Sequence, residues 1–166
     1  MKGGRVLVVD DEPLVCEALS RCLRDEGYVV ETAPDGRTAL DRLPRFKPDA
    51  VLLDLMMPGM NGKQFLRALR DDPAFADLPV VVMTAMTGVN VTQAFGASEM
   101  VQKPFDMNDV LNKVALSVYR ARLARASRTA EHVPVTPTRS IATQQAIAPE
   151  REEQPTVLSV VHTRGA

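Results

Sequence analysis

Residues that could bind a metal ion and a phosphoryl group follow four separate apolar runs of the sequence. They are Asp10 and Asp11, Asp54, Thr84 and Lys103, which come after the runs at residues 5–9, 50–53, 79–83 and 100–102. Clustered carboxylates repel one another unless a cation lies among them, and carboxylate and phosphate oxygens are ligands that suit Mg²⁺. An ammonium and a hydroxyl group add hydrogen-bond donors for phosphoryl oxygens. The set therefore suits transfer of a phosphoryl group onto a carboxylate.

The apolar runs themselves alternate with helical patterns. The run at residues 5–9 (RVLVV) is short, continuous and apolar, which is typical of a parallel strand buried on both faces, whereas the run at 100–102 is a weak strand candidate. We expect strands at residues 5–9, 28–32, 50–53, 79–83 and 100–102, and helices at 13–26, 35–44, 62–70, 89–95 and 106–126. Such alternation predicts an α/β fold with a mostly parallel sheet and helices on both faces. In this architecture ligands bind outside the carboxyl ends of the strands, where the polar residues lie.

Finer features of the helices can also be predicted. The expected inner stripe of the first helix consists of Leu14, Ala18, Leu19, Cys22 and Leu23. The candidate packing positions of the last helix are Val110, Leu111, Val114, Leu116 and Val118. Asp35 is placed to cap the second helix and Pro44 to end it.

Each candidate residue has an ordinary structural reading when it is taken alone. Asp10 and Asp11 could only cap the first helix, and Asp54 could be a loop carboxylate. Thr84 is a common strand residue, and Lys103 precedes Pro104 in a common loop dipeptide. Their joint occurrence at four strand ends of one alternating fold favours the functional reading.

Composition limits the kinds of partner. The chain has 166 residues, 45% of them hydrophobic, and a formal net charge of −1, so composition does not favour nucleic acid or membrane as a bulk electrostatic partner. No apolar run approaches the roughly 20 residues that a membrane-spanning helix needs, and the N-terminus lacks the apolar region of a signal peptide. Cys16 and Cys22 point about 120° apart on one helix, which disfavours a disulfide. We therefore expect a cytoplasmic protein without a membrane partner.

The composition of the chain changes after the last predicted helix. Residues 127–166 contain four prolines, no aromatic residue and many Thr, Ser, Gln and Ala, with Arg and Glu in balance. Little apolar surface is available there to offset the entropy lost on ordering, so we predict a folded domain at residues 2–126 and a disordered tail at 127–166. Residues 156–161 (TVLSVV) are the one stretch that could pair as a strand or dock on a partner.

Four segments, VLVVDDEP, AVLLDLMMPGMNG, PVVVMTA and GASEMVQKPF, resemble in order and spacing the receiver domains of bacterial two-component response regulators. The resemblance covers about residues 2–126 and implies a flavodoxin-like fold with five parallel strands. It implies that Asp54 accepts a phosphoryl group from a phosphohistidine of a sensor histidine kinase or phosphotransfer protein. The further implied roles are Mg²⁺ binding by Asp11, Asp54 and the backbone carbonyl of Met56 with help from Asp10, phosphoryl contacts from Thr84 and Lys103, and a cis bond between Lys103 and Pro104.

The sequence departs from the family pattern at three places. Met100 stands where the family usually has a Tyr or Phe that, with Thr84, reports phosphorylation, so transmission would pass through a flexible side chain without a hydroxyl. The stretch between Thr84 and Gly96 is about one helical turn shorter than is usual. Met56 and Met86 offer no polar group to orient a water molecule at the acyl phosphate, which predicts slow self-dephosphorylation.

Several alternative functions remain open at this point. A dehalogenase-type phosphatase also uses a strand-end Asp and Mg²⁺ but needs a second acid where this chain has Met56. A pseudo-receiver would keep the fold and switch by something other than phosphate. Neither His132 nor His162 lies in the folded part, so an enzyme that uses histidine is not expected. Only self-phosphorylation from phosphodonors and slow self-dephosphorylation are expected as chemistry.

The output of the switch is the last expectation from sequence. Forty residues of this composition are too few to form a DNA-binding or enzymatic output domain, and the arginines near the end of the last helix are read as a solvated cationic helix end. We therefore expect a stand-alone receiver that signals by docking on a downstream protein, without direct DNA binding.

Overall fold

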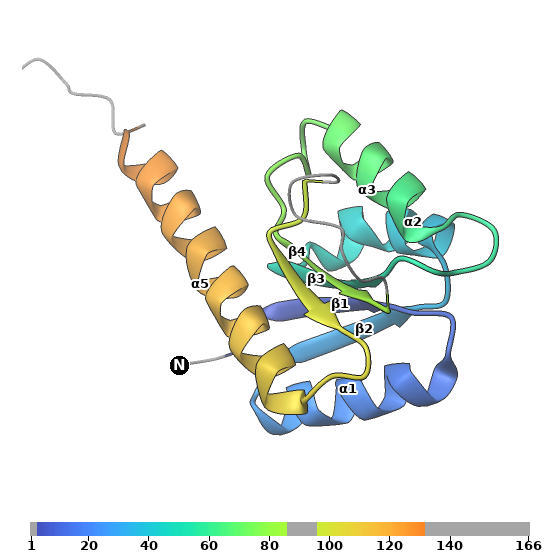
Figure 1. The fold of residues 1–166 in the computed structure, drawn as a ribbon. Helices are drawn as coiled ribbons and strands as arrows, with labels where there is room; N and C mark the ends of the chain where they lie inside the picture. Colours follow the sequence, from blue (N-terminus) through green and yellow to red (C-terminus); the bar gives the residue numbers. More distant parts are fainter. Residues whose placement is uncertain (1–2, 86–95, 132–166) are drawn as a thin grey trace, which may run out of the picture. The chain divides into compact units, whose positions relative to one another are not determined.

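The structure, a computed structural model, describes residues 3–85 and 96–131. Five parallel strands form one sheet with the order β2-β1-β3-β4-β5 (Figure 1). The strands are β1 (Arg5–Val9), β2 (Val29–Ala33), β3 (Ala50–Asp54), β4 (Val80–Thr84) and β5 (Glu99–Gln102). All of them lie within one residue of the positions expected from the sequence. In β1, β3 and β4 the strands are almost continuous runs of Val and Leu, as expected for strands covered on both faces.

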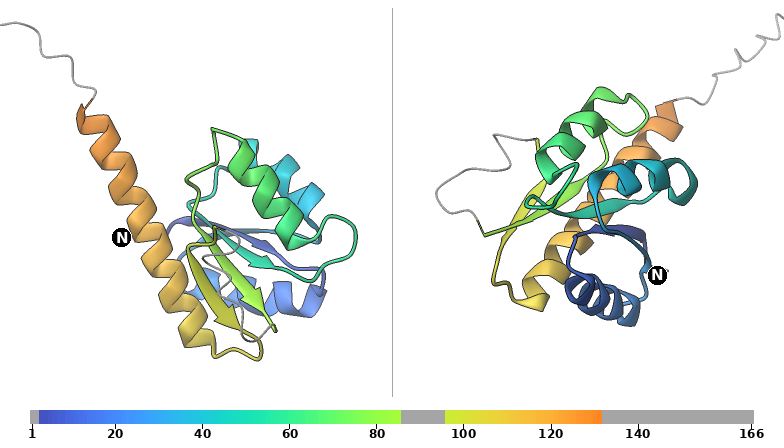
Figure 2. Two further views of the ribbon diagram at one scale, coloured as in Figure 1. Left: turned by 45° about the horizontal axis from the view of Figure 1, so that its top comes forward. Right: turned by 90° about the vertical axis from the view of Figure 1, so that its right-hand side faces the viewer.

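Helices cover both faces of the sheet (Figures 1 and 2). The described helices are α1 (Pro13–Asp25), α2 (Gly36–Phe46), α3 (Gly62–Asp71) and α5 (Met107–Glu131). α1 and α5 pack on one face, and α2 and α3 pack on the other. The prediction of a flavodoxin-like α/β fold is confirmed. The expected helix at residues 89–95 lies outside the described residues.

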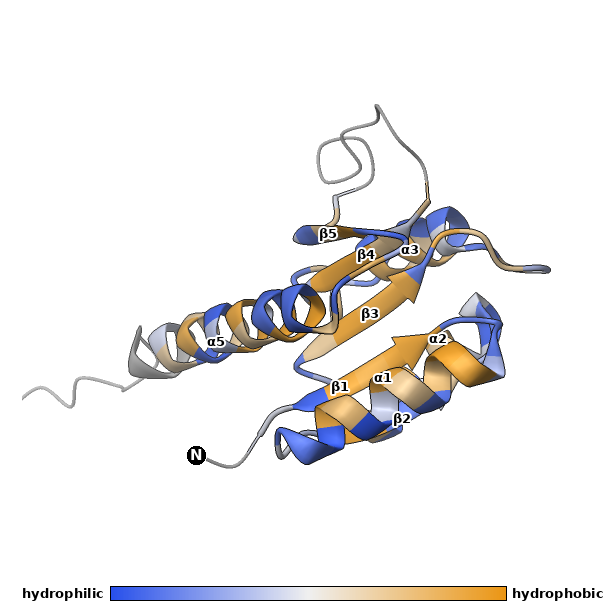
Figure 3. Ribbon diagram, turned by 60° about the horizontal axis from the view of Figure 1, so that its bottom comes forward, coloured by the Kyte–Doolittle hydropathy of each residue, from blue (hydrophilic) through white to orange (hydrophobic). Residues whose placement is uncertain are grey.

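Alternate strand residues feed the two halves of the core. In β1, Val6 and Val8 join the cluster under α1 and α5, whereas Leu7 and Val9 join the cluster under α2 and α3. All four are fully buried, and the central strands are apolar along their length (Figure 3). Burial of each such side chain contributes about 1.5–3 kcal/mol. The two clusters hold the sheet rigid, which fixes the positions of the residues at its carboxyl edge.

Local signals set the ends of α2 and α3. The Asp35 carboxylate accepts a hydrogen bond of 2.8 Å from the Thr38 N–H, which lowers the pKa of that carboxyl. Asn61 and Gln64 form a reciprocal capping box at the start of α3. The predicted end of α2 at Pro44 is wrong, because the helix continues to Phe46. Lys47 then adopts a left-handed conformation with φ 48° and closes the helix on the Leu43 carbonyl.

Three predicted packing positions are also wrong, since Leu14, Ala18 and Leu116 are exposed. Leu14 is 79% exposed and Leu116 is 39% exposed. At about 100° per residue, Leu14 points roughly 140° away from the buried Leu19, and Leu116 points roughly 160° away from the buried Val114. Both therefore lie on the solvent side of their helices.

The last helix is longer than expected. It runs to Glu131, whereas the sequence predicts an end near residue 126. Arg125 is held against the start of β3, since its guanidinium bonds the Asp49 carboxylate at 2.5 Å. This contact fastens α5 at a point beyond the sheet. Residues 132–166, most of the predicted tail, lie outside the described part of the chain, so the boundary of the predicted domain stays a prediction. Within the residues that the structure describes, no helix is both long enough and apolar enough to cross a membrane.

Candidate functional site

Three carboxylates meet at the carboxyl edge of the sheet. Asp10 follows β1, Asp11 is the next residue, and Asp54 is the last residue of β3, the strand beside β1. One oxygen from each lies within 4.8 Å of the others. Asp10 is 1% exposed and Asp54 4% exposed, whereas Asp11 is more accessible. The parallel topology therefore brings together residues that are 44 positions apart in the sequence.

Lys103 supplies the positive charge at this cluster. Its ammonium nitrogen lies 3.1 Å from Asp10 Oδ2, 3.3 Å from Asp54 Oδ2 and 3.9 Å from Glu12 Oε1. Burial acts to lower the pKa of Lys103, but the hydrogen bond and charge of Asp10, together with those of Asp54, raise it above its ordinary value. The lysine is therefore a cation held among carboxylates.

At the carboxyl group of Asp54, burial outweighs the neighbouring hydrogen bond and positive charge, so its pKa is raised. Burial raises its pKa most, and the charge of Asp10 adds to this effect. The hydrogen bond from the Met56 N–H to Oδ1, at 3.2 Å, and the nearby Lys103 act in the other direction but do not cancel it. A buried carboxylate whose charge is only partly compensated gains from a further cation.

Backbone contacts fix the strand ends that carry these side chains. The Lys103 N–H donates to the Thr84 carbonyl at 2.8 Å, which joins the end of β5 to the end of β4. The Lys103–Pro104 bond is cis, as the resemblance implies. Thr84 is fully buried at the end of β4.

On the Asp54 side, α3 begins against the strand backbone. A Cβ on Gly62 would lie 2.4 Å from the Asp54 carbonyl oxygen. Only glycine allows this close approach.

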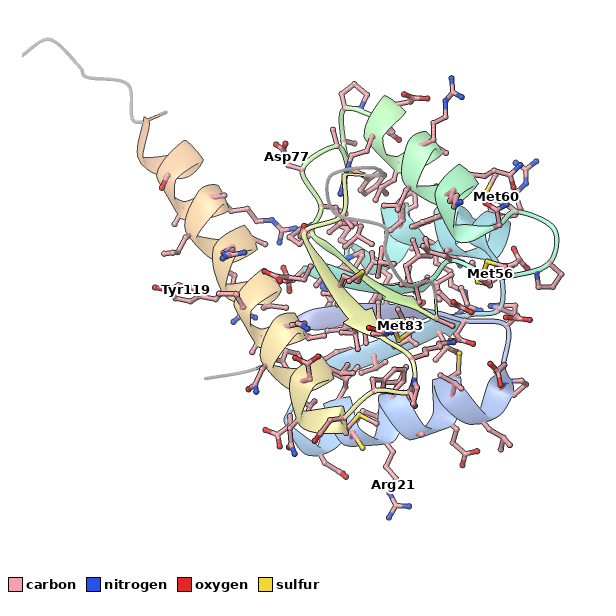
Figure 4. The ribbon with its side chains drawn as sticks, viewed as in Figure 1. Arg21, Met56, Met60, Asp77, Met83 and Tyr119 are labelled. Atoms are coloured by element: carbon pink, nitrogen blue, oxygen red, sulfur yellow. The ribbon has the colours of Figure 1, made fainter. Side chains whose placement is uncertain are left out.

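The two methionines of the predicted site lie in different surroundings. Met56 is 66% exposed beside the acidic cluster, and Figure 4 shows it on the loop that follows β3. Met100 lies on β5, is partly buried, and packs against the cluster under α2 and α3. The structure thus places Met100 on the strand next to Thr84, while its role as a switch stays a prediction. Met86 lies outside the described residues.

Two residues near the site did not stand out in the sequence. Glu12 approaches Lys103 and donates its backbone N–H to Asp10 Oδ1 at 2.9 Å. Cys16 donates its thiol to the Asp10 carbonyl at 3.3 Å, and burial, with the charge of Asp10, raises the pKa of that thiol. In the sequence, the position of Glu12 directly after Asp10 and Asp11 could have indicated that it lies near the site. Cys16 comes near Asp10 only because the chain turns into α1, so the sequence alone gave no such signal for it.

The donor set fits a hard divalent cation. It consists of carboxylate oxygens, two of them from buried residues, and one of those carboxyls has a raised pKa. Oxygen ligands of this kind hold Mg²⁺, Mn²⁺ or Ca²⁺. The acidic pocket could therefore bind a metal ion through Asp10, Asp11 and Asp54.

Comparison with known proteins agrees with this geometry. Residues 6–115 match the family model of the response regulator receiver domain. The DNA-binding response regulator MtrA of Mycolicibacterium smegmatis is 43% identical over 124 residues, which are 73% of this chain and 51% of that protein. The response regulator MprA of Mycolicibacterium vanbaalenii is 43% identical over 113 residues, 66% of this chain and 48% of that protein. The chain thus spans about half the length of these relatives.

Solved structures show the same fold. The chemotaxis protein CheY4 of Vibrio cholerae is 32% identical with a TM-score of 0.65, covering 69% of this chain and 98% of that one. The receiver domain of a histidine kinase from Syntrophus aciditrophicus is 28% identical with a TM-score of 0.65, covering 70% of this chain and 91% of that one.

These relatives correct one expectation from the sequence. The expectation of no direct DNA binding is wrong. The matched relatives include DNA-binding response regulators, and the aligned region is only about half of their length. The expectation rested on the composition of residues 127–166, which carries no information about the output of the whole protein. The match over residues 6–115, the five-stranded fold and the acidic cluster with its lysine lead to one conclusion: this chain belongs to the family of response regulator receiver domains of two-component systems.

Proposed function

We propose that Asp54 is the phosphoacceptor of this receiver domain and that Mg²⁺ is its metal ion. The phosphodonor would be a phosphohistidine of a partner histidine kinase or phosphotransfer protein. The observation that carries the proposal is the position of the Lys103 ammonium, 3.3 Å from the Asp54 carboxylate at the edge of a three-carboxylate cluster. We propose the cytoplasm as the location of this exchange, from family membership alone.

The proposed reaction moves one phosphoryl group. An Asp54 carboxylate oxygen attacks phosphorus, the P–N bond of the phosphohistidine breaks, and the imidazole leaves with the electron pair of that bond. Mg²⁺, when bound, supplies positive charge to the phosphoryl oxygens. Lys103 would shift from the Asp54 carboxylate to a phosphoryl oxygen, and the Thr84 hydroxyl would donate to another. In this proposal Asp11, Asp54 and the Met56 carbonyl bind the metal ion directly, and Asp10 assists.

Phosphorylation from a small donor tests the proposal. The protein is incubated with Mg²⁺ and acetyl phosphate, and the intact mass is measured. We expect a gain of about 80 Da, the mass of one phosphoryl group, which is absent with EDTA and in Asp54→Asn. An unchanged mass in the wild type, under conditions in which another receiver is phosphorylated, would instead favour a pseudo-receiver that binds partners without phosphate.

No other chemistry is proposed for the site. The expected reactions are phosphorylation of Asp54 and slow hydrolysis of the resulting acyl phosphate. A dehalogenase-type phosphatase is not proposed, because Met56 occupies the position of its second acid. If the protein steadily released phosphate from phosphomonoesters and Asp54→Asn abolished this release, the result would show an enzymatic function instead.

DNA binding by the whole protein is a second proposal, and it is favoured by the relatives named DNA-binding response regulators. Phosphorylation would then alter the affinity of the whole protein for DNA. The test is retention on promoter DNA with and without phosphodonor, over a range of salt concentrations. Retention that does not respond to phosphodonor would contradict it.

A further inference from the structure

The methionine side chains of the domain differ widely in their exposure. Met56 is 66% exposed, whereas Met57 is 6% exposed and Met83 is fully buried. The other methionines that the structure describes are partly buried, and they are Met60, Met100 and Met107. Figure 4 shows Met56 and Met60 on the loop that follows β3, so one short loop holds both an open and a partly covered sulfur. An oxidant in solution therefore reaches the Met56 sulfur more readily than the other five.

The two cysteines are less open to oxidation. Both are only partly exposed. Cys16 also donates its thiol to the Asp10 carbonyl at 3.3 Å, and burial, with the charge of Asp10, raises the pKa of that thiol. The thiolate is the form of cysteine that reacts with peroxides, so a raised pKa slows the reaction. A thioether has no proton to lose, and exposure therefore singles out Met56 among the sulfur atoms of the described residues.

Met56 also lies at the mouth of the phosphoacceptor site. Its backbone N–H donates to Asp54 Oδ1 at 3.2 Å, while Asp54 itself is only 4% exposed. The Met56 side chain begins at the carbon bonded to that nitrogen, and it is unbranched with three rotatable bonds. Its sulfur can therefore reach the solvent next to the carboxylate. A chemical change at this sulfur alters the surroundings in which an acyl phosphate would be hydrolysed.

We propose that Met56 is a site of reversible oxidation to methionine sulfoxide, and that the sulfoxide shortens the lifetime of the acyl phosphate at Asp54. The effect on lifetime rests on the proposed phosphorylation of Asp54. The oxidant is a hydroperoxide. A lone pair of the thioether sulfur attacks the terminal peroxide oxygen, and the O–O bond breaks. The departing oxygen takes the proton of the transferred hydroxyl group and leaves as water or an alcohol, so that sulfur loses two electrons and the peroxide gains them.

Oxidation replaces a weak hydrogen-bond acceptor with a strong one. A thioether sulfur holds water poorly, whereas a sulfoxide is polar and its oxygen can accept a hydrogen bond from water. A water molecule held there lies beside the phosphoryl group on Asp54, close enough to attack phosphorus. The unoxidised methionine offers no such group, so hydrolysis should become faster after oxidation.

Uptake of the phosphoryl group should survive oxidation. The contact between Met56 and Asp54 is made by the Met56 backbone N–H, and the metal contact proposed for Met56 is its backbone carbonyl. Neither group changes when the sulfur is oxidised. Lys103 lies 3.3 Å from the other Asp54 oxygen, Oδ2. Oxidation should therefore change the decay of the phosphorylated protein and leave its formation intact.

Peptide mapping tests the site of oxidation. The full chain, in a background with Cys16→Ser and Cys22→Ala whose folding is checked by circular dichroism, is treated with hydrogen peroxide for increasing times, and catalase stops the reaction. Fragment-ion sequencing then assigns the modified residues. We expect Met56 to gain about 16 Da, the mass of one oxygen atom, well before Met60 or Met107 does. Equal rates at these three residues would overturn the proposed site.

Decay of the acyl phosphate tests the effect of the sulfoxide. Protein with and without oxidation at Met56 is phosphorylated with acetyl phosphate and Mg²⁺, separated from the donor, and followed by intact mass. We expect oxidation to shorten the lifetime by at least about fivefold, which is less than the roughly hundredfold effect of a positioned general base. Treatment with methionine sulfoxide reductases should restore the original lifetime.

Three variants assign the effect to one sulfur. Met56→Leu removes that sulfur, so peroxide should not change the lifetime measured for this variant. Met60→Leu is the matched control, because it removes a partly buried sulfur from the same loop, and it should respond to peroxide as the wild type does. Met86→Leu should also respond like the wild type, although Met86 lies outside the described residues.

The outcomes separate this inference from the proposed function. A lifetime that oxidation of Met56 leaves unchanged, or that peroxide shortens equally in Met56→Leu, would overturn the inference. An unoxidised wild type that takes up no phosphoryl group would instead contradict the proposed function.

Discussion

The ammonium nitrogen of Lys103 lies 3.3 Å from a carboxylate oxygen of Asp54, although Lys103 follows β5, Asp54 ends β3, and β4 lies between these strands. The same nitrogen lies 3.1 Å from Asp10. In the absence of metal, this one cation compensates two buried carboxylates.

Replacement of Lys103 by alanine should therefore destabilise the metal-free protein. Loss of the cation leaves Asp10 and Asp54 buried without their partner, at a cost of about 1–3 kcal/mol. Mg²⁺ should restore part of this loss, because it binds the folded state. Urea denaturation with EDTA and with Mg²⁺ measures both effects.

The matched control is Lys113→Ala, which removes a surface pair with Asp109. It should cost less than about 0.5 kcal/mol and respond to Mg²⁺ as the wild type does. Equal losses in the two variants would show that Lys103 has no special role in charge compensation.

Asp54→Asn should stabilise the metal-free protein at neutral pH. The pKa of Asp54 is raised in the folded state, so the ionised carboxylate is disfavoured there relative to the unfolded chain. Its cost is fully present above the folded pKa, shrinks as the pH falls from there toward 3.8, the ordinary value, and is gone below 3.8, where the carboxyl is protonated in both states. Lys103 keeps its partner Asp10 in the variant.

The measurement is denaturation of wild type and Asp54→Asn in EDTA at several pH values between neutral and mildly acidic. The stability advantage of the variant should shrink steadily with falling pH. An advantage that grows toward acid pH would have the wrong sign for a raised pKa.

Gly62→Ala should disturb the backbone at the phosphoacceptor. The added Cβ would lie 2.4 Å from the Asp54 carbonyl oxygen and 2.7 Å from the Leu55 Cα, and neither backbone atom can move without shifting the strand end. We expect a loss of about 2 kcal/mol or more and slower phosphorylation. The opposing effect, the better helix propensity of alanine, is worth only about 1 kcal/mol, so unchanged stability would argue against the close approach.

The phosphorylated protein should be long-lived. Met56 is exposed beside the acidic cluster and has no group that orients water. Met56→Asn adds a hydrogen-bonding side chain there, and we expect hydrolysis to become roughly tenfold faster, a change of about 1.4 kcal/mol in the barrier. Mass spectrometry over time measures both lifetimes. Decay of the wild type within seconds, or equal decay in the variant, would contradict this account.

The sequence predicted the parts of the molecule that depend on strand ends. Asp10, Asp54 and Lys103 each follow a buried apolar run, and parallel strands end at one edge, so their approach followed from topology alone. The limits of the strands were predictable because turn or loop residues follow each apolar run.

Contacts that depend on tertiary geometry could not be predicted in this way. Arg125 of α5 pairs with Asp49, which is 76 positions away in the sequence, and no local pattern predicts this contact. Leu14 seemed apolar enough for the core, but its angle on α1 directs it to solvent. The raised pKa of Asp54 could not be predicted either, because its main cause is burial of the carboxyl group, which only the structure shows.

Covalent mapping of the phosphorylated residue tests the central claim most directly. The protein is phosphorylated with acetyl phosphate and Mg²⁺, the acyl phosphate is reduced with borohydride, and peptides are sequenced by mass spectrometry. The account predicts that the residue converted to homoserine is Asp54 alone. Conversion at Asp10 or Asp11, or continued modification of an Asp54→Asn variant, would contradict it.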